Sequence, residues 1–208
     1  MGMRLESLMY KFFIAAIGAL VCSSAIAADP PTTVVLETEL GVIEIEVFEA
    51  AAPLSSGSFL AFVDGGHLDG GAFYRTVSPG NDNGQPPISV IQGGVTDERE
   101  YPAPVAHETT DMTGIRHEDG VVSLARAEVG TASGAAFFIC IGDQPGLDYG
   151  GMRNPDGQGF AAFGRVVAGM AVVHAIHRRE ATGPSDSPYT EGQILTEPVK
   201  ILAARRKP

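Results

Sequence analysis

Arg75 is the residue whose surroundings most need a chemical explanation. It lies in the segment FYRTV, residues 73–77, between aromatic and β-branched residues that are typical of a buried strand. A guanidinium is almost never fully buried alone, because its charge must keep either water or a hydrogen-bond acceptor. Arg75 is therefore expected either to pair with an acidic side chain or to serve as a fixed cationic donor to a ligand.

Other chemistries have weaker support in the sequence. His174 and His177 could share a metal, but no acidic or cysteine residue stands at a ligand-like spacing, so a solvated helix face is favoured. The segment NPDGQG at 154–159 lacks the alternating acids of a calcium loop and is typical of a turn. Ser133 in GTASG stands one position late for a nucleophile elbow. We therefore expect no metal site, no cofactor and no serine hydrolase.

The elements that would position Arg75 are mostly strands. Residues 33–39 and 42–48 alternate around Leu40-Gly41 and predict a hairpin with one apolar face. Helical spacing predicts one helix over 54–63, after Pro53, and a second over 169–177. The fold expected from this pattern is mainly β: a closed antiparallel barrel capped by two helices, in one domain from about 32 to 204. The six remaining β-like runs are 72–77, 88–92, 120–125, 136–141, 160–167 and 199–203.

Six motifs occur in a fixed order along this domain. They are FYRTV at 73–77, VIQGG at 90–94, VVSLARAE at 121–128, SGAAFFICIG at 133–142, GLD at 146–148 and GFAAFGRVVAGMAVV at 159–173. Together they resemble the cyclophilin family of peptidyl-prolyl cis-trans isomerases, over essentially the whole chain after residue 27. The resemblance implies an eight-stranded antiparallel barrel with a helix at each end and a substrate groove on its outer face.

The resemblance also implies how the groove works. Arg75 occupies the position of a groove arginine that donates hydrogen bonds to the substrate proline, and Gln92 that of a glutamine that holds a substrate carbonyl and positions the arginine. Phe138 matches the floor of the proline pocket. Ala125 and Arg126 match an edge whose backbone pairs with an extended peptide. The pocket walls correspond to Val90, Leu147 and Phe160.

Several positions depart from the family pattern. Arg75 and Gln92 are separated by a polar insertion at 78–87, and a second insertion spans 149–159. Ala136 stands where the family usually has a second glutamine, and Gly146 where an aromatic often precedes "LD". Phe160 takes a position frequently filled by histidine or tyrosine. Because the indole is missing, cyclosporin binding is expected to be weak, and the 149–159 insertion is expected to lean into the gap.

The first 27 residues have the pattern of a cleavable signal peptide. Arg4 and Lys11 precede a short apolar run over 12–21, and small residues ending at Ala27 form an A-x-A site. Cleavage there would remove two basic residues and one acidic residue, lowering the net charge from −11 to about −12. Such an acidic body repels phosphate backbones, so nucleic acid is not an expected partner. Residues 28–31 form a linker, and 205–208 a basic tail.

The function expected from the sequence is an exported prolyl isomerase that acts on proline-containing peptides and unfolded proteins. We expect it to be monomeric and periplasmic, with secretion outside the cell as the alternative compartment, and without a permanent membrane span. Two rival functions stay open: a proline-peptide binding module with little turnover, and a chaperone-like holdase. Cys140 lies in an apolar run and is expected to be a buried small hydrophobe, not a nucleophile.

Overall fold

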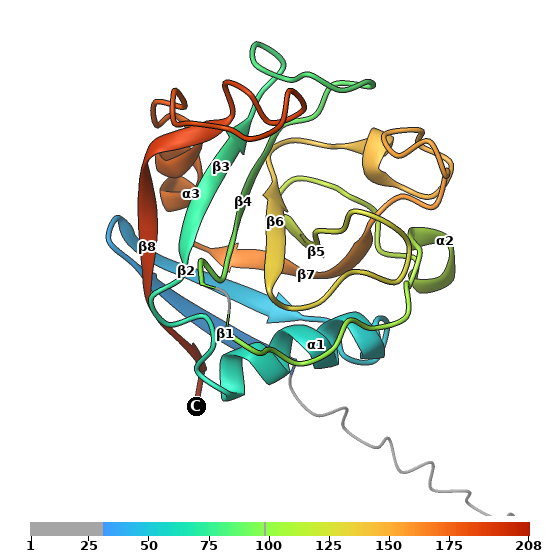
Figure 1. Ribbon diagram of the computed structural model, residues 1–208. Coiled ribbons are helices and arrows are strands. Elements are labelled where there is room, and N and C mark those ends of the chain that lie inside the picture. The colour runs from blue at the N-terminus through green and yellow to red at the C-terminus, as the bar shows by residue number, and fades with distance from the viewer. Residues whose placement is uncertain (1–30, 98) are drawn as a thin grey trace, which may run out of the picture. The chain divides into compact units, whose positions relative to one another are not determined.

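Eight antiparallel strands close into a barrel in the computed structural model, which describes residues 31–97 and 99–208 (Figure 1). Around the barrel the order is β1-β2-β7-β5-β6-β4-β3-β8, and β8 pairs with β1 to close it. The expected mainly β, eight-stranded closed barrel is confirmed. The strands are β1 (Thr32–Thr38), β2 (Gly41–Val47), β3 (Ala72–Val77), β4 (Val90–Gly94), β5 (Val121–Leu124), β6 (Ala136–Cys140), β7 (Ala161–Ala168) and β8 (Ile194–Arg206).

Two longer helices, α1 (Pro53–Asp64) and α3 (Met170–His177), correspond to the two expected from helical spacing. Pro53 starts α1 with a backbone angle suited to a first turn. The buried carboxylate of Glu108 then caps this helix from a distant loop, accepting from the backbone amides of Leu54 at 3.2 Å and Ser55 at 2.7 Å. The sequence did not predict the single turn α2 (Thr110–Thr113) or the 3-10 turn η1 (Pro145–Leu147), which are too short to show a hydrophobic period.

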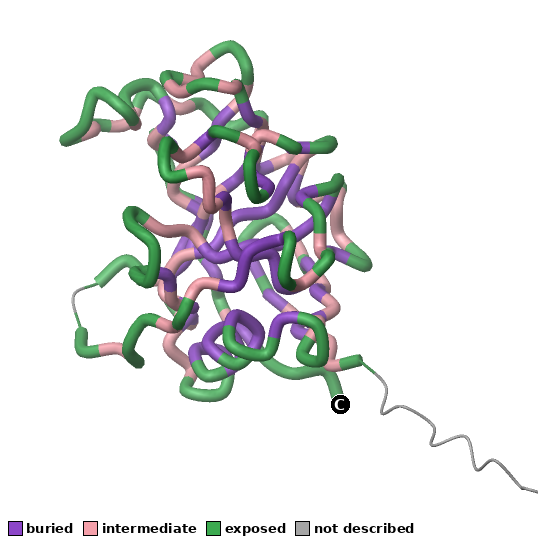
Figure 2. The backbone as a smooth tube through the Cα atoms, turned by 90° about the vertical axis from the view of Figure 1, so that its right-hand side faces the viewer, coloured by how far each residue is buried: buried purple, intermediate pink, exposed green. Residues whose placement is uncertain are grey.

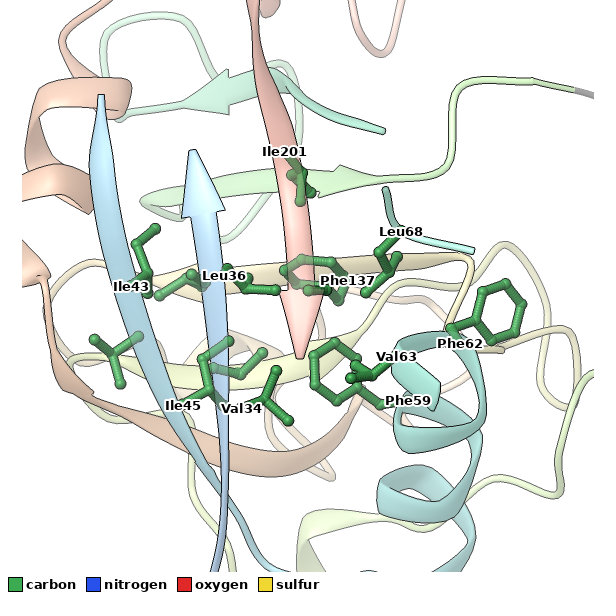
Figure 3. Packing of buried hydrophobic residues seen from close by; sticks show 14 of the residues in the cluster. Val34, Leu36, Ile43, Ile45, Phe59, Phe62, Val63, Leu68, Phe137 and Ile201 are labelled. Atoms are coloured by element: carbon green, nitrogen blue, oxygen red, sulfur yellow. The ribbon is translucent and has the colours of Figure 1, made fainter. Parts of the chain in front are cut away.

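The barrel interior is filled by the apolar faces of the strands and of α1. In the β1–β2 hairpin, Leu36 pairs with Ile43 and Val34 with Ile45, and all four side chains are buried. Figure 3 shows these four side chains packed in one cluster with Phe59 and Val63 of α1. Figure 2 shows the buried backbone gathered at the centre of the domain, with exposed loops around it. The hairpin expected from the alternation is confirmed.

Strand β8 is longer than its apolar run suggests. It begins at Ile194 instead of 199 and continues to Arg206, so Arg205 and Arg206, which were expected in a basic tail at 205–208, lie in the strand. Their side chains are on the solvated side, where Arg205 pairs with Asp69 and Arg206 with Asp64, at 2.7 and 2.8 Å. Pro198 and the charged outward residues mask the strand pattern in the sequence.

Candidate active site

A β-bulge in β3 turns Arg75 out of the barrel. Side chains two apart on a strand share a face, so Arg75 would follow Phe73 into the core if β3 were regular. The β3–β4 register shifts between Phe73, which pairs with Gly93, and Arg75, which pairs with Gln92. The extra residue reverses the alternation, as bulges near binding sites commonly do. Phe73 therefore fills the core, while Arg75 lines a pocket outside it and Val77 is buried in a separate apolar cluster.

Two glutamines hold the guanidinium of Arg75. Its Nη1 donates to Gln92 Oε1 at 2.7 Å, and its Nε and Nη2 donate to Gln193 Oε1 at 2.9 and 2.6 Å. Gln193 donates in turn to the carbonyl of Asn81 at 2.9 Å, and Gln92 to the hydroxyl of Tyr74 at 3.1 Å. A guanidinium has five N–H donors, so two remain for a ligand.

Arg75 is thus held by neutral acceptors. Within residues 31–97 and 99–208, no carboxylate forms an ion pair with it. Burial lowers the pKa of Arg75, Tyr189 opposes this effect, and the positive charge of Arg153 adds to the lowering, but a guanidinium keeps its proton in proteins. Of the two alternatives posed by the sequence, the ion pair is excluded for the described residues. A fixed cation with spare donors is what remains.

A pocket of about 240 Å³ opens beside Arg75. Seven of the eight residues predicted for the site line it: Arg75, Gln92, Ala125, Arg126, Phe138, Leu147 and Phe160. The eighth, Val90, does not line the pocket; it is buried in the apolar cluster that supports the floor, and Ile88 from the same face of the chain takes its place. Three further lining residues were not predicted: Ala127, Asn154 and Tyr189.

The pocket floor is the ring of Phe138. Adjacent residues of β6 point to opposite faces, so Phe137 fills the barrel core while Phe138 belongs to a separate outer cluster. Phe160 meets Phe138 edge to face at 5.3 Å between ring centroids. The result is a small apolar concavity with a cationic donor at its rim, which suits a proline ring next to its imide bond.

A buried polar network supports this floor from beneath. The imidazole of His117 stacks on Phe138 at 5.9 Å, with Nδ1 2.9 Å from Asp148 Oδ1 and Nε2 3.0 Å from Ser123 Oγ. These contacts have the order of a Ser-His-Asp triad, and the sequence did not predict them. Ser123 is fully buried, however, so no substrate can reach its hydroxyl. The network positions Phe138 and is not a hydrolase site.

The predicted peptide-binding edge is partly used by the barrel itself. The amide of Ala125 donates to the carbonyl of Ala136 at 2.9 Å and so cannot bind a peptide, which corrects part of the expectation. The carbonyl of Ala125, and both backbone groups of Arg126, form no hydrogen bond with another described residue. The side chain of Arg126 is held by Asp156 at 2.8 and 2.9 Å, and these bonds lower the pKa of Asp156 to about 2.

The insertion at 78–87, and not the one at 149–159 as expected, lies nearest to the place of the missing aromatic. A Cβ at residue 146 would lie 2.6 Å from Pro86 Cγ, so only glycine fits beneath this loop. Gly93 has a comparable cause, since a Cβ there would meet Phe73 and the carbonyl of Ala72 at 2.8 Å. The glycines in "GLD" and "IQGG" therefore reflect close packing around the pocket.

The rival metal sites find no support in the part of the chain that the structure describes, which contains no cluster of three or more potential ligands. His177 is half-buried and not on a solvated face as expected: its Nε2 lies 2.9 Å from the carbonyl of Val77 and 3.2 Å from Ser89 Oγ.

Cys140 is buried, as expected. Among the described residues, no helix has the length and apolar character to cross a bilayer. The signal peptide expected at 1–27 lies outside the described residues.

Comparison with known proteins points to one family. Residues 33–205 match the family described as "Cyclophilin type peptidyl-prolyl cis-trans isomerase/CLD". A peptidyl-prolyl cis-trans isomerase of Streptomyces antibioticus is 33% identical over 82% of this chain and 99% of its own length. Peptidyl-prolyl cis-trans isomerase A of Dickeya dadantii is 31% identical over 88% of each chain.

Solved structures show the same fold. A cyclophilin type peptidyl-prolyl cis-trans isomerase of Cryptosporidium parvum aligns with a TM-score of 0.63, covering 86% of this chain and 99% of its own, at 18% sequence identity. A second structure of that protein, obtained in the presence of the dipeptide Ala-Pro, aligns with a TM-score of 0.62.

Proposed function

The chain belongs to the family of cyclophilin-type peptidyl-prolyl cis-trans isomerases, and from this membership we propose that it accelerates X-Pro rotation with Arg75 as its catalytic donor. The reaction needs no nucleophile and no proton shuttle. An X-Pro bond is planar because the nitrogen lone pair is delocalised into the carbonyl, and uncatalysed rotation faces a barrier of about 20 kcal/mol. Uncatalysed isomerisation takes tens to hundreds of seconds, which is long enough to limit the rate of folding.

The chemistry follows from what changes as the bond twists. Near ninety degrees the imide nitrogen becomes pyramidal and regains its lone pair, so it becomes a hydrogen-bond acceptor. A guanidinium aimed at this nitrogen stabilises the twisted form more than either planar isomer, which is differential binding of the transition state. The donor acts most strongly when it is fixed in advance and partly shielded from water.

The observation that carries the proposal is the way Arg75 is held. Gln92 and Gln193 accept from three of its five N–H donors without neutralising its charge, which leaves two donors on a side chain that lines the pocket. The Phe138 floor would hold the proline ring, and Gln92 would also contact a substrate carbonyl. The free backbone groups of Ala125 and Arg126 would pair with the extended chain, which gives affinity with little sequence choice.

The decisive experiment replaces Arg75 with alanine. Isomerisation of Suc-Ala-Xaa-Pro-Phe peptides, followed by exchange NMR or by a protease-coupled assay, is expected to lose about a hundredfold or more in kcat/KM. Arg75→Lys keeps the charge but not the planar fork, and is expected to recover little. Arg165→Ala removes an exposed arginine of β7 outside the pocket and serves as the control. Full activity in a folded Arg75→Ala sample would exclude the mechanism.

A proline-peptide binding module is the second candidate, and the observation that favours it is Ala136. Its methyl group cannot supply the hydrogen bond of a second glutamine in the groove. A wild type that binds Pro peptides in calorimetry but shows no exchange catalysis would support this module, or a holdase if unfolded chains also bind. If the missing amide limits turnover, Ala136→Gln is expected to raise kcat.

We propose that the protein acts after export, on exported or unfolded polypeptides. The support is the signal pattern of residues 1–27, with its cleavage site after Ala27. Fractionation of expressing cells, with N-terminal sequencing of the product, tests the proposal. A new N-terminus at Ala28 outside the cytoplasm is expected, and an uncleaved chain in the cytoplasm would exclude export.

We also propose that cyclosporin binds weakly. Gly146 supplies no aromatic wall, and Pro86 fills the space in which a larger side chain would lie. Calorimetric titration is expected to show weak or undetectable binding, whereas a tight complex would show that another surface replaces the indole.

A further inference from the structure

Three loops that are far apart in the sequence meet beside the pocket: residues 78–89, 149–159 and 181–193. Figure 1 shows the loop after β3 and the loop before β8 at the same end of the barrel. Asn83 connects these two directly, since its Nδ2 donates to the carbonyls of Tyr189 at 3.3 Å and Glu191 at 2.8 Å. The connection suggests that the loops act as one unit.

A buried ion pair joins the first two loops. Arg153 donates to both carboxylate oxygens of Asp82 at 2.7 Å, and the two side chains are each 1% exposed. Asp82 also accepts from the backbone amides of Gly84 at 2.9 Å and Ile88 at 2.8 Å, so it organises its own loop. A buried, bidentate pair with its other acceptor sites satisfied has one geometry, and that geometry fixes the loops relative to each other.

Arg153 extends the connection to the third loop. Its Nε and Nη2 donate to the hydroxyl of Tyr189 at 3.2 and 2.9 Å, and its Nη1 donates to the carbonyl of Pro86 at 2.9 Å. Space around the guanidinium is tight, because a Cβ on Gly84 would lie only 2.5 Å from Arg153 Cζ. We call Asp82, Arg153 and Tyr189 the clasp.

The ring of Tyr189 lies against two guanidinium groups. Arg75 Cζ is 5.4 Å from its centroid and Arg153 Cζ is 5.5 Å from it, both within cation–π range. Tyr189 also lines the pocket, although it is 46% exposed. One face of the pocket therefore has an aromatic wall that comes from the loop before β8, while the usual position at Gly146 is closed by Pro86.

From these contacts we propose that Tyr189 is a substrate-contacting residue that replaces the missing aromatic wall, and that the Asp82–Arg153 pair positions it. The inference rests on the proposed isomerase function. The Tyr189 ring limits the space beside the bound proline, and its cation–π contact adds to the restraint that the two glutamines place on Arg75. The hydroxyl anchors the ring to Arg153, and the ring makes the substrate contact.

The first test separates the ring from the hydroxyl. Tyr189→Ala is expected to lower kcat/KM for Suc-Ala-Xaa-Pro-Phe peptides about tenfold, since it removes both the wall and the cation–π contact. Tyr189→Phe keeps the ring and loses only the anchor, so its loss is expected to be smaller, about threefold. The control is Tyr149→Ala, because Tyr149 has a similar exposure of 48% but does not line the pocket.

The second test perturbs the clasp without removing any charge. Gly84→Ala pushes a methyl group against Arg153 and is expected to lower kcat/KM in the same direction as Tyr189→Ala. Combining both changes is expected to cost little more than Tyr189→Ala alone, because they act on one contact. Gly80→Ala in the same loop is the matched control, since its nearest neighbour would be Ser78 Oγ at 3.9 Å.

The outcomes separate this inference from the proposed function. If the wild type is active and the kcat/KM of Tyr189→Ala lies within twofold of it, the inference is overturned and the isomerase function stands. Equal losses of kcat/KM in Tyr189→Phe and Tyr189→Ala would have the same meaning. An inactive wild type would overturn the proposed function. Peptide binding, measured by calorimetry on the same samples, would then decide about Tyr189: an unchanged Kd in Tyr189→Ala would exclude the wall, and a weaker one would support it.

Discussion

At the scale of single residues, the site depends on a cation held by neutral partners. A carboxylate beside Arg75 would orient it equally well but would offset the positive charge on which the proposed mechanism depends. Amide oxygens orient the guanidinium and leave its field largely intact. Gln92 supplies one such oxygen from the neighbouring strand, and Gln193 supplies the other from just before β8.

Gln193 is expected to be a positioning residue for catalysis. Gln193→Met removes the acceptor of two Arg75 donors while keeping the side-chain length, so the guanidinium loses its fixed orientation. We expect kcat to fall about tenfold with KM within about twofold, because the loss concerns the transition state more than the bound ground state.

The matched control for this variant is Gln144→Met. Gln144 is also a buried glutamine that bonds backbone groups, at Ser89 and Ile141, but it does not contact Arg75. Both variants are expected to unfold more easily. A fall in kcat that is no larger for Gln193→Met than for Gln144→Met would show that Gln193 only supports the fold.

The sequence predicted the site residues that lie within the recognised motifs. Arg75, Gln92 and Phe138 were assigned through FYRTV, VIQGG and the "FF" pair, and the structure brings them to one pocket. Gln193 and Tyr189 carried no such signal. They lie more than a hundred residues from Arg75, in a polar loop whose position depends on the pairing of β8 with β3, and no local pattern encodes that pairing.

At the scale of elements, close backbone packing decides where glycine is needed. Gly57 lies inside α1 with nothing within 4 Å of where a Cβ would be, so nothing in the fold requires it. Gly134 is different. A Cβ there would lie 2.7 Å from both Phe62 Cδ2 and the carbonyl of Ser58, because the loop before β6 packs directly on α1.

Replacing each of these glycines with alanine is expected to have opposite effects on stability. Gly57→Ala should raise the free energy of unfolding by about 0.5–1 kcal/mol, since alanine restricts the unfolded chain and favours the helix. Gly134→Ala should lower it by about 1–3 kcal/mol through overpacking. Urea unfolding followed by circular dichroism measures both, and equal shifts for the two variants would contradict the packing described for Gly134.

At the scale of the whole molecule, closure of the barrel removes every free strand edge. The described sheet therefore offers no edge for a peptide to extend, and the proposed substrate would bind across the outer face, at loops and the ends of strands. The alternating strands and two helices predicted the barrel class. Closure between β1 and β8 and the bulge at Arg75 depend on long-range pairing, so the sequence alone could not place them.

The network beneath the pocket links the stability of the whole fold to pH. Burial lowers the pKa of His117, although the hydrogen bond to Asp148 opposes this effect. Burial also opposes ionisation of Asp148, but its bonds with His117 and the charge of Arg116 hold the pKa of Asp148 below its usual value. The folded protein therefore prefers a neutral imidazole beside an ionised carboxylate.

These two shifts have the same sign for stability, in different pH windows. As the pH falls through about 6.5, the unfolded chain binds a proton at His117 that the folded protein refuses, so the free energy of unfolding falls by up to about 1.4 kcal/mol per pH unit until the lowered folded pKa is reached. The contribution of Asp148 is present above about pH 4 and is lost as the pH falls through its lowered pKa.

Urea titrations between pH 7.5 and 5 test the contribution of His117. The free energy of unfolding should fall with pH in the wild type and fall less steeply in His117→Asn, whatever the variant's overall stability. Parallel slopes for the wild type and His117→Asn would mean that proton uptake elsewhere governs acid unfolding.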